Sequence, residues 1–239
     1  MWDSVLYHAV ATLLNLNVWG GELVGAEELP GRSPAVYVAN HARSLGPIAV
    51  TSSLPFRVYP WAIGDMMDWE KAPAYLERDF VQPELHLRPP PSMWLSRLIA
   101  QFSIRLLRGV KCIPVWQGDR LLETFHLSLD FLVQGRPLLI FPEDPASPLD
   151  DVCRMRPFKK GFARLGEMYF ECSGQMLSFY PLAVHEQLRL VKVGRGVLFN
   201  PHNDRARERL RLASVLEAAI RSMLLEMNTR SYAGVPLPY

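Results

Sequence analysis

The sequence predicts an α/β fold: a single domain with a mixed, mostly parallel sheet and helices on both faces. Three observations lead to this prediction. A chain of 239 residues, 49% of them hydrophobic, is long enough to bury a sizeable core. Short β-branched runs alternate with amphipathic helical patterns through its middle section. The run at residues 137–141 is almost entirely apolar, which is typical of a strand buried on both faces.

Charge and cysteine content exclude several classes of protein. The formal net charge is only +2, so we expect no nucleic-acid partner, because nucleic-acid binding needs a strongly basic footprint. The three cysteines are odd in number and lack C-x-x-C spacing, which argues against a disulfide framework and a zinc site. We therefore expect a reducing compartment, the cytoplasm, with neither a metal nor an organic cofactor.

Residues 1–20 predict an amphipathic helix that precedes an α/β domain at residues 21–239. Apolar side chains recur there with the spacing of one helix face: Trp2, Val5, Leu6, Ala9, Val10, Leu13 and Leu14. No Lys or Arg precedes Leu14, unlike a secretory signal, and the segment is too polar for a bilayer span. Two placements stay open: packing on the core, or lying in the membrane interface, which exposed positions of Trp2 and Trp19 would favour.

The first strand of the α/β domain is expected at residues 35–39. It is rich in β-branched and aromatic residues and delivers the polar pair Asn40-His41 to a turn. Pro47 has the fixed φ that suits the first turn of a helix, so we expect a helix over residues 45–54.

The next part of the chain contains a strand and then a long stretch without periodicity. The strand is expected at residues 56–63. Residues 65–91 show no helical or strand pattern, so we expect an irregular connection. Long connections of this kind form either lids over binding sites or surface excursions that pack their own cluster.

Helix and strand patterns alternate through the rest of the chain. The clearest helix covers residues 92–108 and has one apolar face formed by Leu95, Leu98, Ile99, Phe102 and Leu106. Further elements are expected as strands at 110–115, 137–141 and 176–184, helices at 119–134, 161–171 and 204–228, and a hairpin of 190–193 with 196–199.

Polar residues follow two of the expected strands. His41 comes after the strand at 35–39, and Glu143 and Asp144 come after the strand at 137–141. Open α/β sheets place their sites at such strand ends. Imidazole is well suited to accepting a proton near neutral pH, so His41 is a candidate general base.

Four separated segments occur in one order: Asn40-His41, residues 109–115, Phe141-Pro142-Glu143 and residues 180–184. The ordered set resembles the PlsC-like glycerolipid acyltransferase family over residues 35–200. This resemblance implies acyl transfer from a thioester donor, acyl-CoA or acyl carrier protein, to a hydroxyl of a glycerophospholipid-type acceptor. It also implies that His41 is the general base.

The chain departs from the family pattern in three motifs. Gly46 stands where the family has the Asp that orients the imidazole. In the serine-protease triad, loss of the orienting carboxylate costs about 10⁴ in rate. Trp116 and Gln117 replace the family's Asp-Arg pair, with Arg120 three positions beyond, and Asp144 replaces a Gly.

We expect Glu143 or Asp144 to orient His41 in place of the missing Asp. Cationic side chains of the loops are expected to meet the phosphates of donor or acceptor, with Arg156 among them. The expected substrate-binding set is Asn40, Arg43, Ser44, Gly46, Arg120, Lys159 and Lys160. Peripheral contact with the inner face of a membrane, and the oligomeric state, are left open.

The sequence leaves one alternative to an enzyme of this kind open and disfavours two others. A non-catalytic homologue that binds lipid or acyl ligands would also lack the orienting Asp. An α/β-hydrolase is disfavoured because the chain contains no G-x-S-x-G segment. Gly194-x-Gly196 lacks the third glycine and the following helix of a dinucleotide site.

Overall fold

The computed structural model describes residues 2–30, 33–42 and 45–232. Its internal contacts divide the chain into two compact units. The sheet unit comprises residues 1–58 and 129–239, and the helical unit comprises residues 59–128. Helix α6 (Leu121–Val133) runs through the boundary between them. The expected boundary after residue 20 stays a prediction.

The sheet unit contains a mixed sheet in the order β1-β7-β6-β2-β5, with β8 paired to β6. Three of these strand pairs are parallel and two, β6 with β7 and β6 with β8, are antiparallel. The α/β class and the mixed, mostly parallel sheet are thus confirmed. The strands are β1 (Glu22–Val24), β2 (Ala35–Ala39), β5 (Leu138–Ile140), β6 (Ser178–His185), β7 (Leu190–Val193) and β8 (Val197–Leu198).

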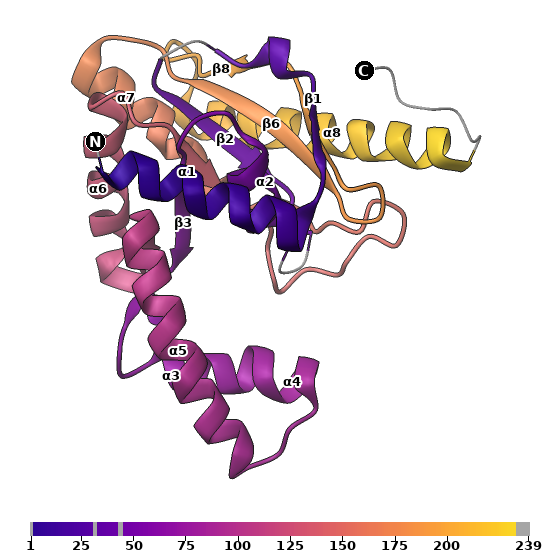
Figure 1. Ribbon diagram of the computed structural model, residues 1–239. Coiled ribbons are helices and arrows are strands. Elements are labelled where there is room, and N and C mark those ends of the chain that lie inside the picture. Colours follow the sequence, from indigo (N-terminus) through magenta and orange to yellow (C-terminus); the bar gives the residue numbers. More distant parts are fainter. Residues whose placement is uncertain (1, 31–32, 43–44, 233–239) are drawn as a thin grey trace. The chain divides into compact units, whose positions relative to one another are not determined.

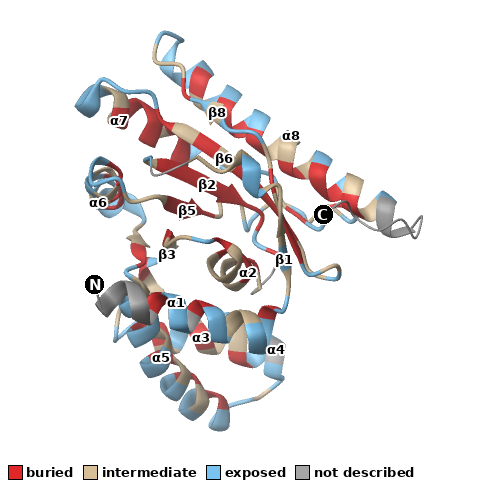
Figure 2. Ribbon diagram, turned by 45° about the horizontal axis from the view of Figure 1, so that its top comes forward, coloured by how far each residue is buried: buried red, intermediate tan, exposed pale blue. Residues whose placement is uncertain are grey.

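Helices cover both faces of this sheet, as expected (Figure 2). Side chains alternate along β2, so Tyr37 faces the core that includes α2 (Gly46–Ser53) while Val36 faces the other way. Phe179 of β6 is in register with Val36, and its ring lies 6.1 Å from that of Phe162. That second face is covered by η6 (Lys160–Ala163), α7 (Arg164–Ser173) and α8 (Arg205–Tyr232).

The N-terminal segment forms α1 (Trp2–Leu14) and a π-helical turn, η1 (Asn15–Trp19). Tyr7 and Ala11 are buried, and α1 packs against α2, which supports the core placement for this edge of the helix. Trp19 is only 1% exposed and belongs to the core, so it gives no support to the membrane-interface placement. Its flat ring fills the space against Gly21, where a Cβ atom would meet it.

The apolar face expected for α1 is described only in part. The side chains of Trp2, Val5, Leu6 and Val10 lie outside the described residues. Leu13 and the neighbouring Leu16 are largely exposed, whereas Tyr7 and Ala11 take the buried positions.

The helical unit contains a parallel strand pair and a set of short helices (Figure 1). The stretch at 65–91, expected to be irregular, is mostly helical. Residues 72–85 are helical without a break, and the π-helical turn at Glu77–Val81 interrupts the 3.6-residue repeat on which the sequence prediction depends. The elements are β3 (Tyr59–Ile63), η3 (Gly64–Met67), α3 (Ala72–Leu76), η4 (Glu77–Val81), α4 (Gln82–Leu85), α5 (Pro91–Val110), β4 (Ile113–Val115) and η5 (Gly118–Arg120).

The long helix α5 packs through a different face from the expected one. Its buried edge consists of Ser92, Ser96, Ala100 and Ile104, which repeat every four residues. Ala100 and Ile104 form a core cluster with Ala72 and Leu76 of α3. Ile99 of the expected face is partly buried and packs against this cluster, whereas Leu98, Phe102 and Leu106 stay exposed. Across the described residues, the chain has no helix with the length and apolar character needed to span a bilayer.

The hairpin expected at residues 190–199 is wrong. Strands β7 and β8 do form there, but each pairs with β6. Gly194 donates its N–H to the carbonyl of Pro181 in β6 at 2.9 Å, which holds the connection along that strand. The long strand β6 thus pairs with β7 through residues 182–185 and with β8 through residues 178–179.

Candidate functional site

Asn40 and His41 follow the central strand β2. The side chain of Asn40 is buried and pairs with the backbone of Val184 in β6. Its Nδ2 donates to the carbonyl of Val184 at 3.0 Å, and the N–H of Val184 donates to Oδ1 at 2.8 Å. The side-chain amide of Asn40 therefore continues the hydrogen-bond ladder between β2 and β6 beyond the end of β2. It thereby fixes the backbone from which the next residue, His41, extends.

Glu143 holds His41 from the other neighbouring strand. The N–H of His41 donates to Oε1 of Glu143 at 2.5 Å, and the N–H of Arg156 donates to Oε2 at 2.8 Å. Strand β5 runs parallel to β2, so their carboxyl ends meet at one edge of the sheet. The ring of Phe141 lies 5.3 Å from the imidazole at an angle of 60°. The Glu143 carboxylate therefore binds the backbone of His41, and the Phe141 ring contacts its imidazole.

Asp144 is bound by the loop that follows it. Its carboxylate accepts hydrogen bonds from the N–H of Ala146 at 3.1 Å and from Ser147, and Nζ of Lys159 lies 3.1 Å from Oδ1. The Ala146 N–H and then the Lys159 ammonium favour the charged form, so the pKa of Asp144 lies below its ordinary value. The role of Glu143 or Asp144 in orienting the imidazole ring stays a prediction.

The loop after β5 is folded back on itself and tied to helix α8. Glu143 and Phe158 form an antiparallel bridge, and the N–H of Lys159 donates to the carbonyl of Pro142 at 2.9 Å. The N–H of Phe158 donates to Oε2 of Glu217 in α8 at 2.8 Å. Helix α8 therefore fixes the segment that carries Lys159 and the neighbouring Lys160.

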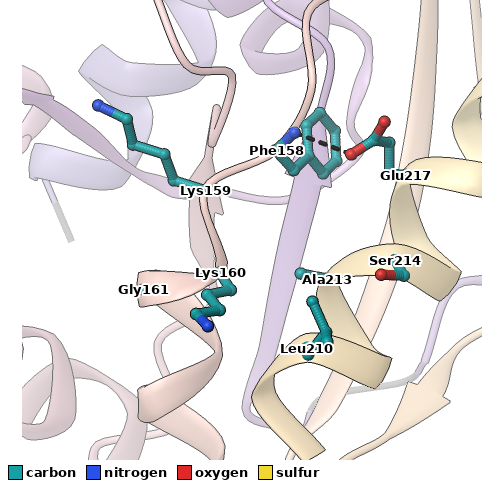
Figure 3. A pocket seen from close by; sticks show the side chains of 8 residues that line it. All are labelled: Phe158, Lys159, Lys160, Gly161, Leu210, Ala213, Ser214 and Glu217. Atoms are coloured by element: carbon teal, nitrogen blue, oxygen red, sulfur yellow. Dashed lines mark hydrogen bonds between the residues drawn. The ribbon is translucent and has the colours of Figure 1, made fainter. Parts of the chain in front are cut away.

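A pocket of about 510 Å³ lies between this segment and α8. Figure 3 shows the lining residues, with the hydrogen bond from Phe158 to Glu217 among them and the side chain of Lys159 extending away from α8. The lining residues are Phe158, Lys159, Lys160, Gly161, Leu210, Ala213, Ser214 and Glu217. Of the predicted substrate-binding lysines, Lys159 is thus paired with Asp144, and Lys160 lies at the start of η6 beside the pocket.

Gly46 packs directly against His41. Its N–H donates to the carbonyl of His41 at 3.1 Å. A Cβ atom at Gly46 would lie 2.2 Å from that carbonyl oxygen and 2.7 Å from the carbonyl carbon. Both are backbone atoms that cannot swing aside, so no side chain fits at this position without a shift of the turn. Arg43 and Ser44, between His41 and Gly46, lie outside the described residues.

Arg120 belongs to the helical unit. Its guanidinium lies 3.8 Å from the centre of the Trp116 ring and pairs with Glu123, with Nη2 to Oε2 at 2.8 Å. The N–H of Trp116 donates to Oγ1 of Thr124 at 3.1 Å. A second pocket, of about 560 Å³, is lined by Met67, Asp68, Trp69, Glu70, Arg108, Pro114, Trp116 and Arg120.

Hydrogen bonds and an ion pair link six of the predicted site residues to their neighbours at this end of the sheet: Asn40, His41, Gly46, Glu143, Asp144 and Lys159. Lys160 lies at the start of η6, beside the pocket at α8. The sequence prediction missed Glu217, which lies in a helix whose pattern marks only its buried stripe. Among the described residues, no three His, Cys, Asp or Glu side chains are grouped so that they could hold a metal ion.

Comparisons with known proteins give one kind of match. No protein-family model matches the chain, and no curated protein sequence matches it. Among solved structures, it is similar to the crystal structure of the 1-acyl-sn-glycerophosphate (LPA) acyltransferase PlsC from Thermotoga maritima. The TM-score is 0.58 at 15% sequence identity, and the match covers 93% of this chain and 80% of that one. The chain thus shares the fold of a PlsC acyltransferase.

Proposed function

We propose that the protein is an acyltransferase that moves an acyl group from a thioester donor, acyl-CoA or acyl carrier protein, to a hydroxyl of a glycerophospholipid-type acceptor. The observation that carries this proposal is that two neighbouring strands fix the Asn40-His41 segment by hydrogen bonds. Asn40 binds the backbone of β6, and Glu143 from the end of β5 binds the backbone of His41. A histidine fixed in this way at a strand end suits general-base catalysis.

In the proposed reaction, the His41 imidazole accepts the proton of the acceptor hydroxyl as its oxygen attacks the thioester carbonyl. The resulting tetrahedral intermediate collapses with cleavage of the carbon–sulfur bond. The imidazolium then returns the proton to the leaving thiolate, so the products are an ester and a thiol. No covalent enzyme intermediate is needed, and Asn40 and Glu143 act as positioning residues.

Phosphate recognition is assigned to the cationic residues of the loops, with Lys160 as the first candidate. Lys159 already neutralises Asp144, and this pairing reduces the repulsion that Asp144 would exert on an anionic acceptor. Arg43, Ser44 and Gly46 complete the proposed substrate-binding set of the sheet unit, and the expected role of Arg120 stays a prediction. We place the reaction on the cytoplasmic side, where thioester donors meet lipid acceptors at the membrane surface.

The test is an acyl-transfer assay with labelled oleoyl-CoA or oleoyl-acyl carrier protein and lysophosphatidic acid. His41→Ala should lower product formation by about 10²–10⁴, the range of general-base catalysis. His126→Ala, a change at an exposed histidine of α6, should leave the rate unchanged. Equal rates for wild type and His41→Ala would refute the proposal.

A second function, binding of acyl ligands without turnover, is favoured by one observation. Gly46 packs against the backbone of His41, where the resemblance calls for an Asp side chain. Wild-type protein that forms no ester but binds a non-hydrolysable thioether analogue of acyl-CoA saturably, measured by calorimetry, would establish this function instead.

A further inference from the structure

Helix α5 presents an unusual apolar stripe on its outer face. Trp94, Leu98 and Phe102 are 69%, 66% and 69% exposed, and they follow one another at intervals of four residues. Scattered apolar residues are normal on protein surfaces, but a contiguous stripe of large side chains marks an interaction surface. Leu106 continues the stripe with 36% exposure. We call these four residues the α5 stripe.

Positive charge lies along one edge of the α5 stripe. Arg97 and Arg105 are exposed and lie three and eleven positions after Trp94, which places them on the flank next to it. Arg108 lies four positions after the buried Ile104, and its Nη2 donates to the carbonyl of Met67 at 3.1 Å. The helix Pro91–Val110 contains no Asp or Glu. The guanidinium groups of Arg105 and Arg108 each lie 5.4 Å from the centre of the half-exposed Trp69 ring. The surface thus combines apolar, aromatic and cationic side chains.

The opposite edge of α5 is already occupied. Ser92 donates its hydroxyl to Glu77 at 2.6 Å, and Ala100 and Ile104 pack on α3. The helical unit therefore holds α5 by its narrow small-residue edge and presents the α5 stripe outward. A helix of 20 residues is about 30 Å long, so the presented surface is an extended line and not a pocket.

We propose that the α5 stripe docks on an anionic phospholipid surface, with α5 lying in the plane of the membrane interface. Trp94, Leu98 and Phe102 enter the boundary between headgroups and acyl chains, where amphipathic aromatic and aliphatic side chains are favourable. Arg97 and Arg105 lie beside them and bind headgroup phosphates, because each basic residue near an anionic surface strengthens the attachment. The proposal does not depend on catalysis by His41.

Co-sedimentation of the full chain with vesicles tests this docking. Wild-type protein should pellet with vesicles of equimolar phosphatidylcholine and phosphatidylglycerol, and weakly with phosphatidylcholine alone. The triple change Trp94→Ser, Leu98→Ser and Phe102→Ser should lower the partition coefficient about a hundredfold, since each buried apolar side chain contributes to insertion. Because these side chains are exposed, the variant should keep the wild-type circular dichroism and thermal midpoint.

A matched triple change removes exposed apolar side chains elsewhere. Val152, Met176 and Leu225 of the sheet unit are 62%, 52% and 44% exposed. Changing these three to Ser should leave vesicle binding as in wild type, and so should His41→Ala. Equal loss of binding in both triple variants would show unspecific attraction by exposed apolar groups and overturn the proposal.

The charge contribution is tested separately. Arg97→Gln with Arg105→Gln should lower binding to the anionic vesicles roughly thirtyfold and leave the weak binding to phosphatidylcholine alone unchanged. Vesicle binding that survives the serine changes at the α5 stripe would overturn the proposal. If those changes instead convert a dimer into a monomer in sedimentation velocity without loss of vesicle binding, the stripe is covered by a second copy of the chain.

Discussion

The end of strand β2 and the outer face of helix α5 are both marked by apolar patterns in the sequence, yet they differ completely in the folded chain. Every residue of β2 is at most 1% exposed, because β5 and β6 cover its two edges and helices cover its two faces. The α5 stripe contains three side chains about two-thirds exposed. Hydrophobic periodicity thus identifies a face but does not tell whether the fold covers it.

The two regions also differ in how firmly the fold holds their side chains. At the β2 end, strand pairing and buried side chains fix the position of each atom, so small changes should be costly. On the α5 stripe the side chains have few neighbours, so substitutions should alter binding and leave the fold intact. Substitutions at buried and at exposed positions distinguish the two cases, and the position with the least room is Gly46.

Gly46→Asp, the change that would supply the carboxylate of the family pattern, should destabilise the protein by about 4 kcal/mol and should not raise acyl-transfer activity. The reason is steric, since the new Cβ atom would meet the carbonyl group of His41 at 2.2 Å. Urea unfolding measures the loss, and the acyl-transfer assay measures activity.

Gly109→Ala is the matched control for this loss. Gly109 lies inside helix α5, where a Cβ atom would meet nothing within 4 Å. This change should raise the free energy of unfolding by up to about 1 kcal/mol, the helix-propensity difference between the two residues. A stable, more active Gly46→Asp protein would show that the turn at His41 adapts more easily than we infer.

Glu208 provides the next largest effect, in a buried part of the sheet unit. Burial opposes its ionisation, but hydrogen bonds from Arg211, the N–H of Asn200 and Asn203 outweigh that effect and lower its pKa from 4.5 to about 2. Because the folded-state pKa is depressed, the stabilisation is complete above pH 4.5 and is lost as pH falls towards 2. The shift corresponds to about 3 kcal/mol.

Glu208→Gln should therefore lower the free energy of unfolding at neutral pH by about 3 kcal/mol and flatten its dependence on pH in the acid range. Urea unfolding of both proteins across that range measures the difference. Glu123→Gln, which removes an exposed partner of Arg120, should leave the profile nearly unchanged. Parallel acid profiles for wild type and Glu208→Gln would contradict the assignment.

Asn40→Ala tests the ladder that positions His41. The change leaves the buried N–H of Val184 without its side-chain partner, which should cost about 2 kcal/mol in unfolding free energy. Under the proposed function, kcat should fall at least about tenfold while KM changes little, because the amide acts through the placement of His41. A rise in KM with unchanged kcat would instead assign Asn40 to substrate binding.

The sequence predicted the parts of the fold that rest on local patterns. The strand at β2, the start of α2 near Pro47 and the C-terminal helix α8 follow from residue type and spacing. The helical run at residues 72–85 was not predicted because the π-helical turn within it interrupts the 3.6-residue repeat. The pairing of β7 and β8 with β6 was missed because strand order is a tertiary property.

The candidate site shows the same limit. His41 and Glu143 were identified as candidates, but the hydrogen bond between them joins residues 102 positions apart and depends on β5 lying beside β2. The sequence marked Gly46 as a missing carboxylate, whereas the structure shows a position without space for a side chain. The close approach of Gly46 to the backbone of His41 cannot be read from the pattern of hydrophobic residues.

Leu98→Gln is the change with the smallest expected effect, and it tests the contrast most directly. Leu98 loses little contact on unfolding because it is 66% exposed, so the free energy of unfolding should change by no more than about 0.5 kcal/mol. Ile104→Ala, six residues along the same helix but fully buried against α3, should cost about 3 kcal/mol. Urea unfolding of both variants gives their free energies of unfolding and so compares the exposed and the buried face of the same helix. A loss at Leu98 as large as that at Ile104 would mean that the α5 stripe is covered in solution, and the outer face of α5 would then belong to the core.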